Sequence, residues 1–385
     1  MEKSTGIYRN DSASSHNIEM ILSARIHEYQ EPLMIDSIPK PKVSHGEEVL
    51  IRVGAAWLCH SDLHLMNGEW KDVLPLKLPK TPGHEVAGWI EEMGELVPDS
   101  ALMNKGDLVA IFGGWGCGIC KYCKGGDEQL CNFSRWPGLS AYDGGYSEFI
   151  LVPSYRFLIK VNKQYNNSSS NGSSNSSIHP EELAPLSDAG LTPYRAIKKI
   201  RHLLGPGKTI AIFGIGGLGS YAIQYAKTLG QSSTIIALDR KEEKLQLAEK
   251  FGADYAVNVS NSQNIRSEII KITEGRGRGV DVIVDCVGSE ATIEDSCRIL
   301  NKGGSLVIVG LFGSQIKIPL VRAVLQEYQV YGSLWGNYNE LREVIELAKA
   351  GKIKHNIQKF PLSEINEAIQ LLKNGEIVGR GVIIP

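Results

Sequence analysis

Two kinds of hydrophobic pattern divide this chain. Between Ile21 and about Val161, short runs alternate apolar and polar residues between glycines and prolines, as in EVLIRV at 48–53 and EVAGWIEEM at 85–93. An alternation with a period of two is typical of strands that bury one face. The first part of the chain is therefore expected to form a β-rich domain.

The pattern changes after Leu191. Apolar runs then alternate with amphipathic stretches of helical period, beginning with TIAIFG at 209–214, SYAIQYAKTLG at 220–230 and STIIALD at 233–239. The alternation continues through KEEKLQLAEKFG, DVIVDCVG and SLVIVG. Strands that alternate with helices are typical of a parallel sheet wound with helices on both faces. The second part is therefore expected to be a doubly wound α/β domain.

The chain ends with a segment of a third kind. From about Asn337 it contains two helical stretches, at 340–351 and 362–375, and then a short apolar run at 379–385. We expect this segment to pack back on the first domain. The predicted division is an extension at 1–20, a β-rich domain at 21–190, an α/β domain at 191–336 and a returning segment at 337–385.

Two stretches are expected to have no fixed structure. Residues 1–20 are polar and rich in Ser and Asn, and QYNNSSSNGSSNSS at 164–177 is of low complexity. Segments with so few apolar side chains cannot bury enough surface to order themselves. The first is interpreted as a disordered extension and the second as a surface insertion in the β-rich domain.

Composition places the chain among soluble enzymes. Its 385 residues are enough for two packed cores, and a composition of 42% hydrophobic and 22% charged residues is ordinary for a globular protein. The formal net charge of -2 argues against nucleic-acid or acidic-membrane partners. Neither a secretion signal nor a membrane span is predicted, so a cytoplasmic location is expected. In a reducing compartment the seven cysteines are expected to hold metal rather than form disulfides.

Four cysteines form the most specific motif. Cys117, Cys120, Cys123 and Cys131 are spaced C-x2-C-x2-C-x7-C in a glycine-rich stretch. Tetrahedral zinc takes four thiolates, and cysteines on a turning loop can supply them. An iron-sulfur cluster and unmetallated thiols are the alternatives, but bacterial ferredoxins place the fourth cysteine three residues later and before proline. The spacing therefore favours a structural zinc site.

A second metal site is suggested by residues far apart in the sequence. Cys59, His84 and Asp188 could give zinc one sulfur, one nitrogen and one oxygen ligand and leave the fourth position open for substrate. Their spacing alone also fits core positions for Cys59 and His84 and a helix cap for Asp188.

A glycine loop predicts a dinucleotide site. Gly214, Gly216, Gly217, Leu218 and Gly219 lie between an apolar run and a helical stretch, where the backbone can approach a pyrophosphate. Asp239 ends the next apolar run, and a carboxylate there favours NAD over NADP. The alternatives are a helix cap for Asp239 and acceptance of NADP beside Arg240.

With these motifs the chain resembles the zinc-containing medium-chain alcohol dehydrogenases from Ile21 to Pro385. The stretches that carry the resemblance are CHSDLH, TPGHEVAGWIEEMG, GCGICKYCKGGDEQLC, DGGYSEFILVP, PLSDAGLTPYRA, IFGIGGLG and GRGVIIP. The PLSDAGLTPY and SLWG segments are most similar to the microbial branch that acts on secondary alcohols and ketones. The resemblance implies a GroES-like catalytic domain and a Rossmann cofactor domain.

The resemblance also implies the catalytic zinc ligands. Cys59 and His84 match two of them, and Asp188 stands where many members carry cysteine but this branch carries aspartate. An oxygen ligand makes such a site harder. Glu85 is expected to be an outer partner or an alternate ligand, and Asp62 to orient the metal-bound imidazole.

Proton transfer and cofactor binding are assigned in the same way. Ser61 and His64 match a relay that carries the alcohol proton through the nicotinamide ribose to solvent, although His64 could be an ordinary loop histidine. The residues expected at the cofactor are His60 and Arg380 at the pyrophosphate, Thr192 below the nicotinamide and Lys244 at the adenosine ribose. Turn, helix-surface and ion-pair roles are the alternatives for Thr192, Lys244 and Arg380 respectively.

Three tryptophans complete the implied site. Trp70, Trp115 and Trp335 stand at positions that line the substrate cleft in relatives, and each could equally belong to the core. Aromatic walls favour apolar substrates of limited size. We expect Trp115, next to the four cysteines, to be the best candidate of the three.

The predicted activity is reversible hydride transfer between NAD and a secondary or medium-sized apolar alcohol, giving a ketone or aldehyde. Two zinc ions per chain are expected, one catalytic and one structural, and a homo-oligomer, either dimer or tetramer. The alternatives are an aldehyde or semialdehyde reductase of the same family, a zinc-independent quinone or enone reductase, and a non-catalytic nucleotide-binding protein.

Overall fold

The computed structural model describes residues 18–161, 178–260, 265–273, 279–377 and 379–385. The insertion predicted at 164–177 lies outside the described residues, as do positions 1–17 of the predicted extension. The first strand already begins at Met20, inside the stretch predicted to be disordered.

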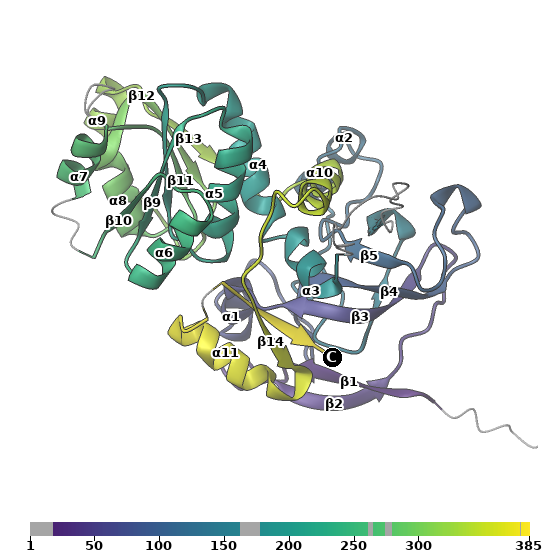
Figure 1. Ribbon diagram of the computed structural model, residues 1–385. Coiled ribbons are helices and arrows are strands. Elements are labelled where there is room, and N and C mark those ends of the chain that lie inside the picture. Colours follow the sequence, from purple (N-terminus) through teal and green to yellow (C-terminus); the bar gives the residue numbers. More distant parts are fainter. Residues whose placement is uncertain (1–17, 162–177, 261–264, 274–278, 378) are drawn as a thin grey trace, which may run out of the picture.

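A seven-stranded sheet organises the β-rich part and takes strands from both ends of the chain. Its order is β14-β15-β3-β4-β5-β7, and β6 also pairs with β3. All of these pairs are antiparallel except β14 with β15. The strands are β3 (Val49–Trp57), β4 (Glu85–Met93), β5 (Leu108–Ile111), β6 (Phe149–Val152), β7 (Leu158–Lys160), β14 (Ile357–Pro361) and β15 (Arg380–Ile384). In Figure 1 the yellow C-terminal strands lie beside the purple N-terminal ones.

Short elements surround this sheet. A separate hairpin pairs β1 (Met20–Arg25) with β2 (Met34–Pro39). The helices of this part are α1 (His60–Met66), α2 (Lys121–Lys124), α3 (Pro180–Leu183), α10 (Tyr338–Lys349) and α11 (Ile365–Asn374), and η4 (Ala184–Ser187) contacts β3, β4 and β5. The start of α10 is encoded locally, because Asn337 and Glu340 form a capping box around its first turn.

The second part is a six-stranded parallel sheet in the order β10-β9-β8-β11-β12-β13. It corresponds to the strand order 3-2-1-4-5-6 of dinucleotide-binding folds, so the predicted Rossmann domain is confirmed. The strands are β8 (Thr209–Phe213), β9 (Thr234–Asp239), β10 (Tyr255–Asn258), β11 (Val280–Asp285), β12 (Leu300–Ile308) and β13 (Gln329–Gly332). The helices are α4 (Leu191–Ile200), α5 (Gly217–Leu229), α6 (Glu242–Lys250), α7 (Ile265–Ile272), α8 (Glu290–Ile299) and α9 (Leu320–Leu325).

Strand β8 is apolar from Ile210 to Phe213 because both of its faces are buried. Ile210 and Ile212 pack into one hydrophobic cluster, while Ala211 and Phe213 pack into another on the opposite face of the sheet. A central parallel strand covered by helices on both faces has no polar side. Among the described residues, no helix is both long and apolar enough to cross a membrane.

Candidate metal and cofactor sites

The four predicted cysteines converge on one loop, from Cys117 to Cys131, which we call the four-cysteine loop. One sulfur from each lies within 4.8 Å of the others, and none is in a disulfide. Cys123 Sγ lies 3.6 Å from Cys120 Sγ and 4.0 Å from Cys117 Sγ. Thiolates about 2.3 Å from a tetrahedral zinc would be about 3.8 Å apart. The spacing therefore fits zinc closely.

Backbone amides support these sulfurs as thiolates. Cys120 begins α2 as its N-cap and accepts a hydrogen bond from the Cys123 amide, and Cys131 Sγ accepts from the amides of Cys117 and Phe133. Amides of Ile119 and Cys120 lower the pKa of Cys117 to about 6. Burial raises the pKa of Cys123 to about 12, so the lowered pKa favours the metal-binding thiolate form at Cys117 and not at every sulfur of the loop.

A second group of ligand atoms, which we call the mixed cluster, is formed by Cys59, His84, Glu85 and Asp188. Their candidate ligand atoms also lie within 4.8 Å of one another. Cys59 is the N-cap of α1, His84 and Glu85 stand at the start of β4, and Asp188 follows η4. The fold therefore brings together residues up to 129 positions apart, from Cys59 to Asp188.

The histidine of the mixed cluster has one nitrogen in use and one without a partner. His84 is buried, and its Nδ1 lies 3.2 Å from Asp62 Oδ1. Among the described residues, no hydrogen bond reaches its buried Nε2, which lies 3.3 Å from Asp188 Oδ2. Nitrogen and oxygen ligands about 2.1 Å from a tetrahedral zinc would be about 3.4 Å apart. This unpartnered nitrogen and its distance to Asp188 fit a shared metal.

Asp62 is held by a residue that the sequence did not identify. Tyr146 donates its hydroxyl hydrogen bond to Asp62 Oδ2 at 2.7 Å, and the Cys59 amide donates to the same oxygen at 3.0 Å. Tyr146 and Asp62 are both fully buried. Tyr146 lies in the DGGYSEF stretch, but nothing in that stretch indicates a partner 84 positions away.

The oxygen of Asp188 that does not face His84 is held by Thr192. Thr192 Oγ1 donates to Asp188 Oδ1 at 2.5 Å, and the Thr192 amide donates to the Asp188 carbonyl at 2.7 Å. The N-cap of α4 is Gly190, so Asp188 does not cap that helix. Asp188 Oδ2 is thereby turned toward His84.

Glu85 already has protein partners on both oxygens. Its Oε1 accepts from Arg380 Nη2 at 2.8 Å, and its Oε2 accepts from the Ala189 amide at 3.2 Å. Burial raises the pKa of Glu85 to about 7, although Arg380 opposes the shift. A carboxylate engaged in this way suits an outer partner of the metal better than a ligand.

The two predicted relay residues lie on α1. Ser61 Oγ accepts a weak hydrogen bond from Cys59 Sγ at 3.6 Å. His64 is hydrogen-bonded to Glu69 through Nδ1, and its ring stacks on Trp70 with centroids 5.0 Å apart. Among the described residues, no hydrogen bond joins Ser61 directly to His64. Glu69 was not predicted from the sequence.

The glycine loop has the close packing expected of a cofactor cradle. Gly214 follows β8 with φ of +81°, and Gly217 is the first residue of α5. A Cβ on Gly219 would lie 2.0 Å from the Gly214 carbonyl oxygen, and one on Gly217 would lie 2.3 Å from Arg380 Nη1. Gly216 has open space around its Cα, and Leu218 is half-buried. Side chains at Gly214, Gly217 or Gly219 would therefore disrupt the loop or its contact with Arg380, whereas Gly216 leaves free space.

Asp239 ties this loop to the end of β9. Its Oδ2 accepts from the Ile215 amide at 2.7 Å, and its Oδ1 accepts from the amides of Arg240 and Lys241. Lys241 is the N-cap of α6, so Asp239 is not a helix cap. Arg240 is exposed beside it, where a ribose phosphate could be accommodated.

Cationic and imidazole groups gather near the loop. His60 is exposed at the start of α1, and the charges of Arg380 and Lys244 both act on it. These three residues come from the β-rich part, the C-terminal strand and α6. Desolvation, together with the charges of Arg380 and Lys244, lowers the pKa of His60 to about 4, so His60 is a neutral hydrogen-bonding group there. Arg380 and Lys244 supply the positive charge of this region, which suits the phosphates and ribose of a dinucleotide.

The tryptophans separate into two groups. Trp335 lies with its ring edge-on to His84 at 5.7 Å and stacks on Trp136 at 4.6 Å, while its Nε1 donates to the Ser187 carbonyl. Trp136, which the sequence did not identify, therefore belongs near the mixed cluster. Trp115 is only 2% exposed and packs against Phe157, which favours the core alternative for this residue.

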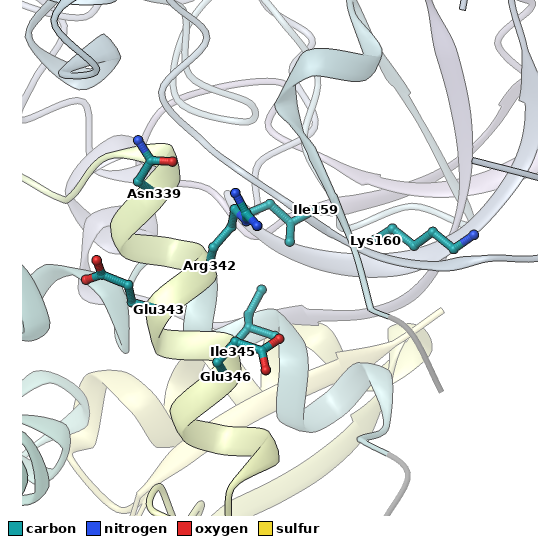
Figure 2. Close-up of a pocket in the computed structure, with 7 residues that line it drawn as sticks. All are labelled: Ile159, Lys160, Asn339, Arg342, Glu343, Ile345 and Glu346. Carbon is teal, nitrogen blue, oxygen red and sulfur yellow. The ribbon is translucent and has the colours of Figure 1, made fainter. Parts of the chain in front are cut away.

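A groove of about 680 Å³ lies away from all of these residues. It is formed between β7 and α10, and Figure 2 shows Arg342 directed toward Ile159 across it. Its lining residues are Ile159, Lys160, Asn339, Arg342, Glu343, Ile345 and Glu346, none of which was predicted as a site residue.

Comparisons with known proteins cover almost the whole chain. Residues 45–163 match the alcohol dehydrogenase GroES-like domain family, and residues 217–350 match the zinc-binding dehydrogenase family. The chain is 42% identical over 368 residues to the NAD-dependent alcohol dehydrogenase of Sulfurisphaera tokodaii, covering 94% of this chain and 99% of the relative. The predicted GroES-like domain is thus confirmed.

Two further similarities bear on structure and cofactor. The crystal structure of the alcohol dehydrogenase from Aeropyrum pernix is 40% identical, with a TM-score of 0.85, covering 94% of this chain and 100% of that one. The D-arabinose 1-dehydrogenase (NADP(+)) of Saccharolobus solfataricus is 36% identical, covering 96% of this chain and 99% of the relative. Similar chains therefore include an NADP-linked enzyme that is named for a sugar.

Proposed function

The chain belongs to the zinc-containing medium-chain alcohol dehydrogenase family, and from that premise we propose which of its residues carry the reaction. It is a zinc-dependent, NAD-linked alcohol dehydrogenase that acts on small molecules. The observation that supports the residue assignment best is the buried, unpartnered His84 Nε2 that faces Asp188.

The mixed cluster is the proposed catalytic metal site. Cys59, His84 and Asp188 would hold the zinc, and the four-cysteine loop would hold a second ion, so that the expected content is about two zinc ions per chain. Bound zinc acts as a Lewis acid toward the alcohol oxygen, and bound NAD accepts hydride. Glu85 stays outside the ligand set because Arg380 and Ala189 occupy its oxygens.

The surrounding residues orient these ligands. Asp62 accepts from His84 Nδ1 and so fixes the tautomer that presents Nε2, while Tyr146 fixes Asp62. Thr192 holds one oxygen of Asp188 and leaves the other toward His84. Each of the two ligands is therefore set by a dedicated hydrogen-bond partner.

Proton movement is assigned to α1. Ser61 Oγ lies beside Cys59 at the mixed cluster and is proposed to take the alcohol proton while it gives up its own hydroxyl proton, which would move on toward His64 through the nicotinamide ribose of bound NAD. His64 is the proposed group that exchanges a proton with solvent, since its side chain is partly exposed and hydrogen-bonded to Glu69. The same groups would supply the proton when a ketone or aldehyde is reduced.

Cofactor binding is assigned to the glycine loop and the positive region beside it. The residues proposed to contact NAD are Gly214, Gly216, Gly217, Leu218, Gly219, Asp239, Arg240, Lys244, His60, Thr192 and Arg380. Asp239 would favour NAD through the adenosine ribose, and the exposed Arg240 is the group that would tolerate NADP.

The proposed substrate is a secondary or medium-sized apolar alcohol. Trp335 and Trp136 form an aromatic pair next to His84, and such a wall favours apolar groups over hydroxylated ones. An NADH-forming assay over primary alcohols, secondary alcohols, diols, hydroxy acids and aldoses tests this choice. Highest kcat/KM for secondary alcohols is expected, whereas a clear preference for aldoses would contradict it.

A homo-oligomer is proposed through the edge of the Rossmann sheet. Within the described ranges β13 pairs only with β12, and α9, which directly precedes β13 in the chain, exposes Leu320, Val321, Val324 and Leu325, each at least 65% exposed. An unpaired strand edge next to an apolar helix suits a second copy of the same chain across a two-fold axis. Light scattering should give a dimer or tetramer, and Leu320→Asp with Val324→Asp should shift it toward monomer.

The domain division and the location are also proposals. Pairing of β15 with β3 supports a catalytic domain at 21–190 completed by residues 337–385, with the cofactor domain at 191–336. All seven cysteines are free, which supports residence in the reducing cytoplasm.

A further inference from the structure

A buried arginine on α4 joins the four-cysteine loop to the C-terminal segment. Arg195 is 8% exposed and makes two charged hydrogen bonds of 2.9 Å each, from Nη2 to Asp127 Oδ1 and from Nη1 to Glu340 Oε2. Asp127 lies between Cys123 and Cys131, and Glu340 lies in the first turn of α10. Figure 1 shows α4 and α10 side by side at the junction of the two parts.

Asp127 is the point where these contacts meet. Besides Arg195, its Oδ1 accepts from Gln129 Nε2 at 3.3 Å and from Asn337 Nδ2 at 3.4 Å. Burial alone would raise the pKa of Asp127, but its donors and Arg195 lower it below the ordinary value. The carboxylate is thus a fixed anion that belongs to the four-cysteine loop.

One connection from this anion to the mixed cluster runs through α4. Arg195 lies three positions after Thr192, so the two side chains are about one helical turn apart. Thr192 holds Asp188 through both its hydroxyl and its amide. A displacement of α4 would therefore move the carboxylate that faces His84.

A second connection runs through the segment before α10. Asn337 contacts Asp127 and caps α10, and Trp335 stands two residues earlier. The Trp335 indole donates to the Ser187 carbonyl at 2.7 Å, and Ser187 directly precedes Asp188. Trp335 adopts φ of +45°, which a bulky side chain rarely does, so its surroundings hold it there.

We propose that Arg195 is a positioning residue that couples the four-cysteine loop to the metal ligand Asp188. Both connections begin at the Arg195–Asp127 ion pair and end at Asp188. The proposal rests on the proposed function, because it takes Asp188 as a ligand. Loss of Arg195 is expected to free α4 from the loop and to weaken retention of the metal in the mixed cluster.

The chain offers a matched control for a merely stabilising ion pair. Lys198 on α4 pairs with Glu343 on α10 at 2.5 Å, so it joins the same two helices, but it does not contact the four-cysteine loop. If Arg195 acted only by tying α4 to α10, then Lys198→Ala, which removes another ion pair between these helices, would affect zinc retention as much as Arg195→Ala.

The test is zinc release from the intact protein to a chromogenic chelator. The unchanged chain should release zinc in two phases, and Asp188→Ala should lose the faster one, which assigns that phase to the mixed cluster. Arg195→Ala should accelerate this phase by about tenfold or more, because the loss of residues that support the ligands commonly weakens metal binding by about that factor. Arg195→Lys and Asp127→Asn should give smaller accelerations, and Lys198→Ala should give none.

Cobalt substitution provides a second measurement. The visible spectrum of cobalt in the mixed cluster should shift in Arg195→Ala, and in Arg195→Lys it should be closer to that of the unchanged chain. A loss of overall stability would not produce this spectral shift. Release from the mixed cluster at the unchanged rate in Arg195→Ala would overturn the coupling. Two zinc ions retained in Asp188→Ala would instead overturn the ligand assignment, so the two failures are distinguishable.

Discussion

Arg380 and Glu85 form a buried ion pair that joins the mixed cluster to the glycine loop. Arg380 Nη2 donates to Glu85 Oε1 at 2.8 Å, while its Nη1 lies beside Gly217 at the start of α5. The two residues are 295 positions apart. A single side chain on β15 therefore contacts Glu85 of the mixed cluster and the glycine loop proposed to bind pyrophosphate.

The first prediction separates these two roles of Arg380. Arg380→Ala leaves the Glu85 carboxylate buried without its cation, which is expected to cost about 3–5 kcal/mol of stability. It should also raise the Kd for NAD. Adding Glu85→Gln should recover part of the unfolding free energy but not the NAD affinity. Recovery of both would show that Arg380 does not contact the cofactor.

The second prediction concerns Tyr146. Tyr146→Phe removes the hydroxyl that donates to Asp62, and it is expected to cost about 1.5–3 kcal/mol because the acceptor is a buried carboxylate. Since Asp62 orients His84, zinc affinity of the mixed cluster should fall by about 10–100-fold. Competition with a chelator measures this, with Tyr142→Phe as control because its ring packs on Trp115 instead. Equal zinc affinities in the two variants would contradict the role of Tyr146 in holding Asp62.

The third prediction concerns cofactor choice. Asp239→Ala should weaken NAD binding by about tenfold or more, since charged hydrogen bonds to the ribose are lost, and should affect NADP less. Asp254→Ala is the control, because that carboxylate also accepts from a backbone amide, at Ile235 near the other end of β9. Fluorescence titration with both cofactors gives the ratio, and equal losses for NAD and NADP would exclude the ribose contact.

The fourth prediction concerns the substrate cleft. Trp136→Ala removes the half-buried ring that stacks on Trp335, so bulkier secondary alcohols should gain about 10–200-fold in kcat/KM relative to small ones. Trp115→Phe should leave this ratio unchanged, because Trp115 lies in the core. If the kcat/KM ratio between bulky and small alcohols changed in Trp115→Phe but not in Trp136→Ala, Trp115 would line the cleft, as the sequence analysis expected.

The features that could be predicted from the sequence are those encoded by residues close together in the chain. The four cysteines and the glycine loop are each encoded within a short stretch of chain. Spacing predicted the cysteine site, and spacing together with the flanking strand and helix patterns predicted the glycine loop. The parallel sheet around β8 was predicted from the alternation of apolar runs and helical stretches, whereas the order of its strands comes from the structure. Such features depend on backbone geometry and not on distant side chains.

The residues that were missed are those whose partners are distant in sequence. Tyr146 contacts Asp62 across 84 positions, and Arg195 contacts Asp127 across 68. A lone tyrosine or arginine has many possible roles, and only the packed fold selects one. Trp115 shows the same limit, since an indole beside a metal loop can face either a cleft or the core.

The most direct test of the account is the zinc content of Asp188 variants, measured by elemental analysis of the pure protein. The unchanged chain should contain about two zinc ions, and Asp188→Ala about one, with the four-cysteine loop still occupied. Asp188→Cys should keep about two, since a thiolate can replace the carboxylate. About two zinc ions in Asp188→Ala, with its activity intact, would contradict the proposed catalytic site.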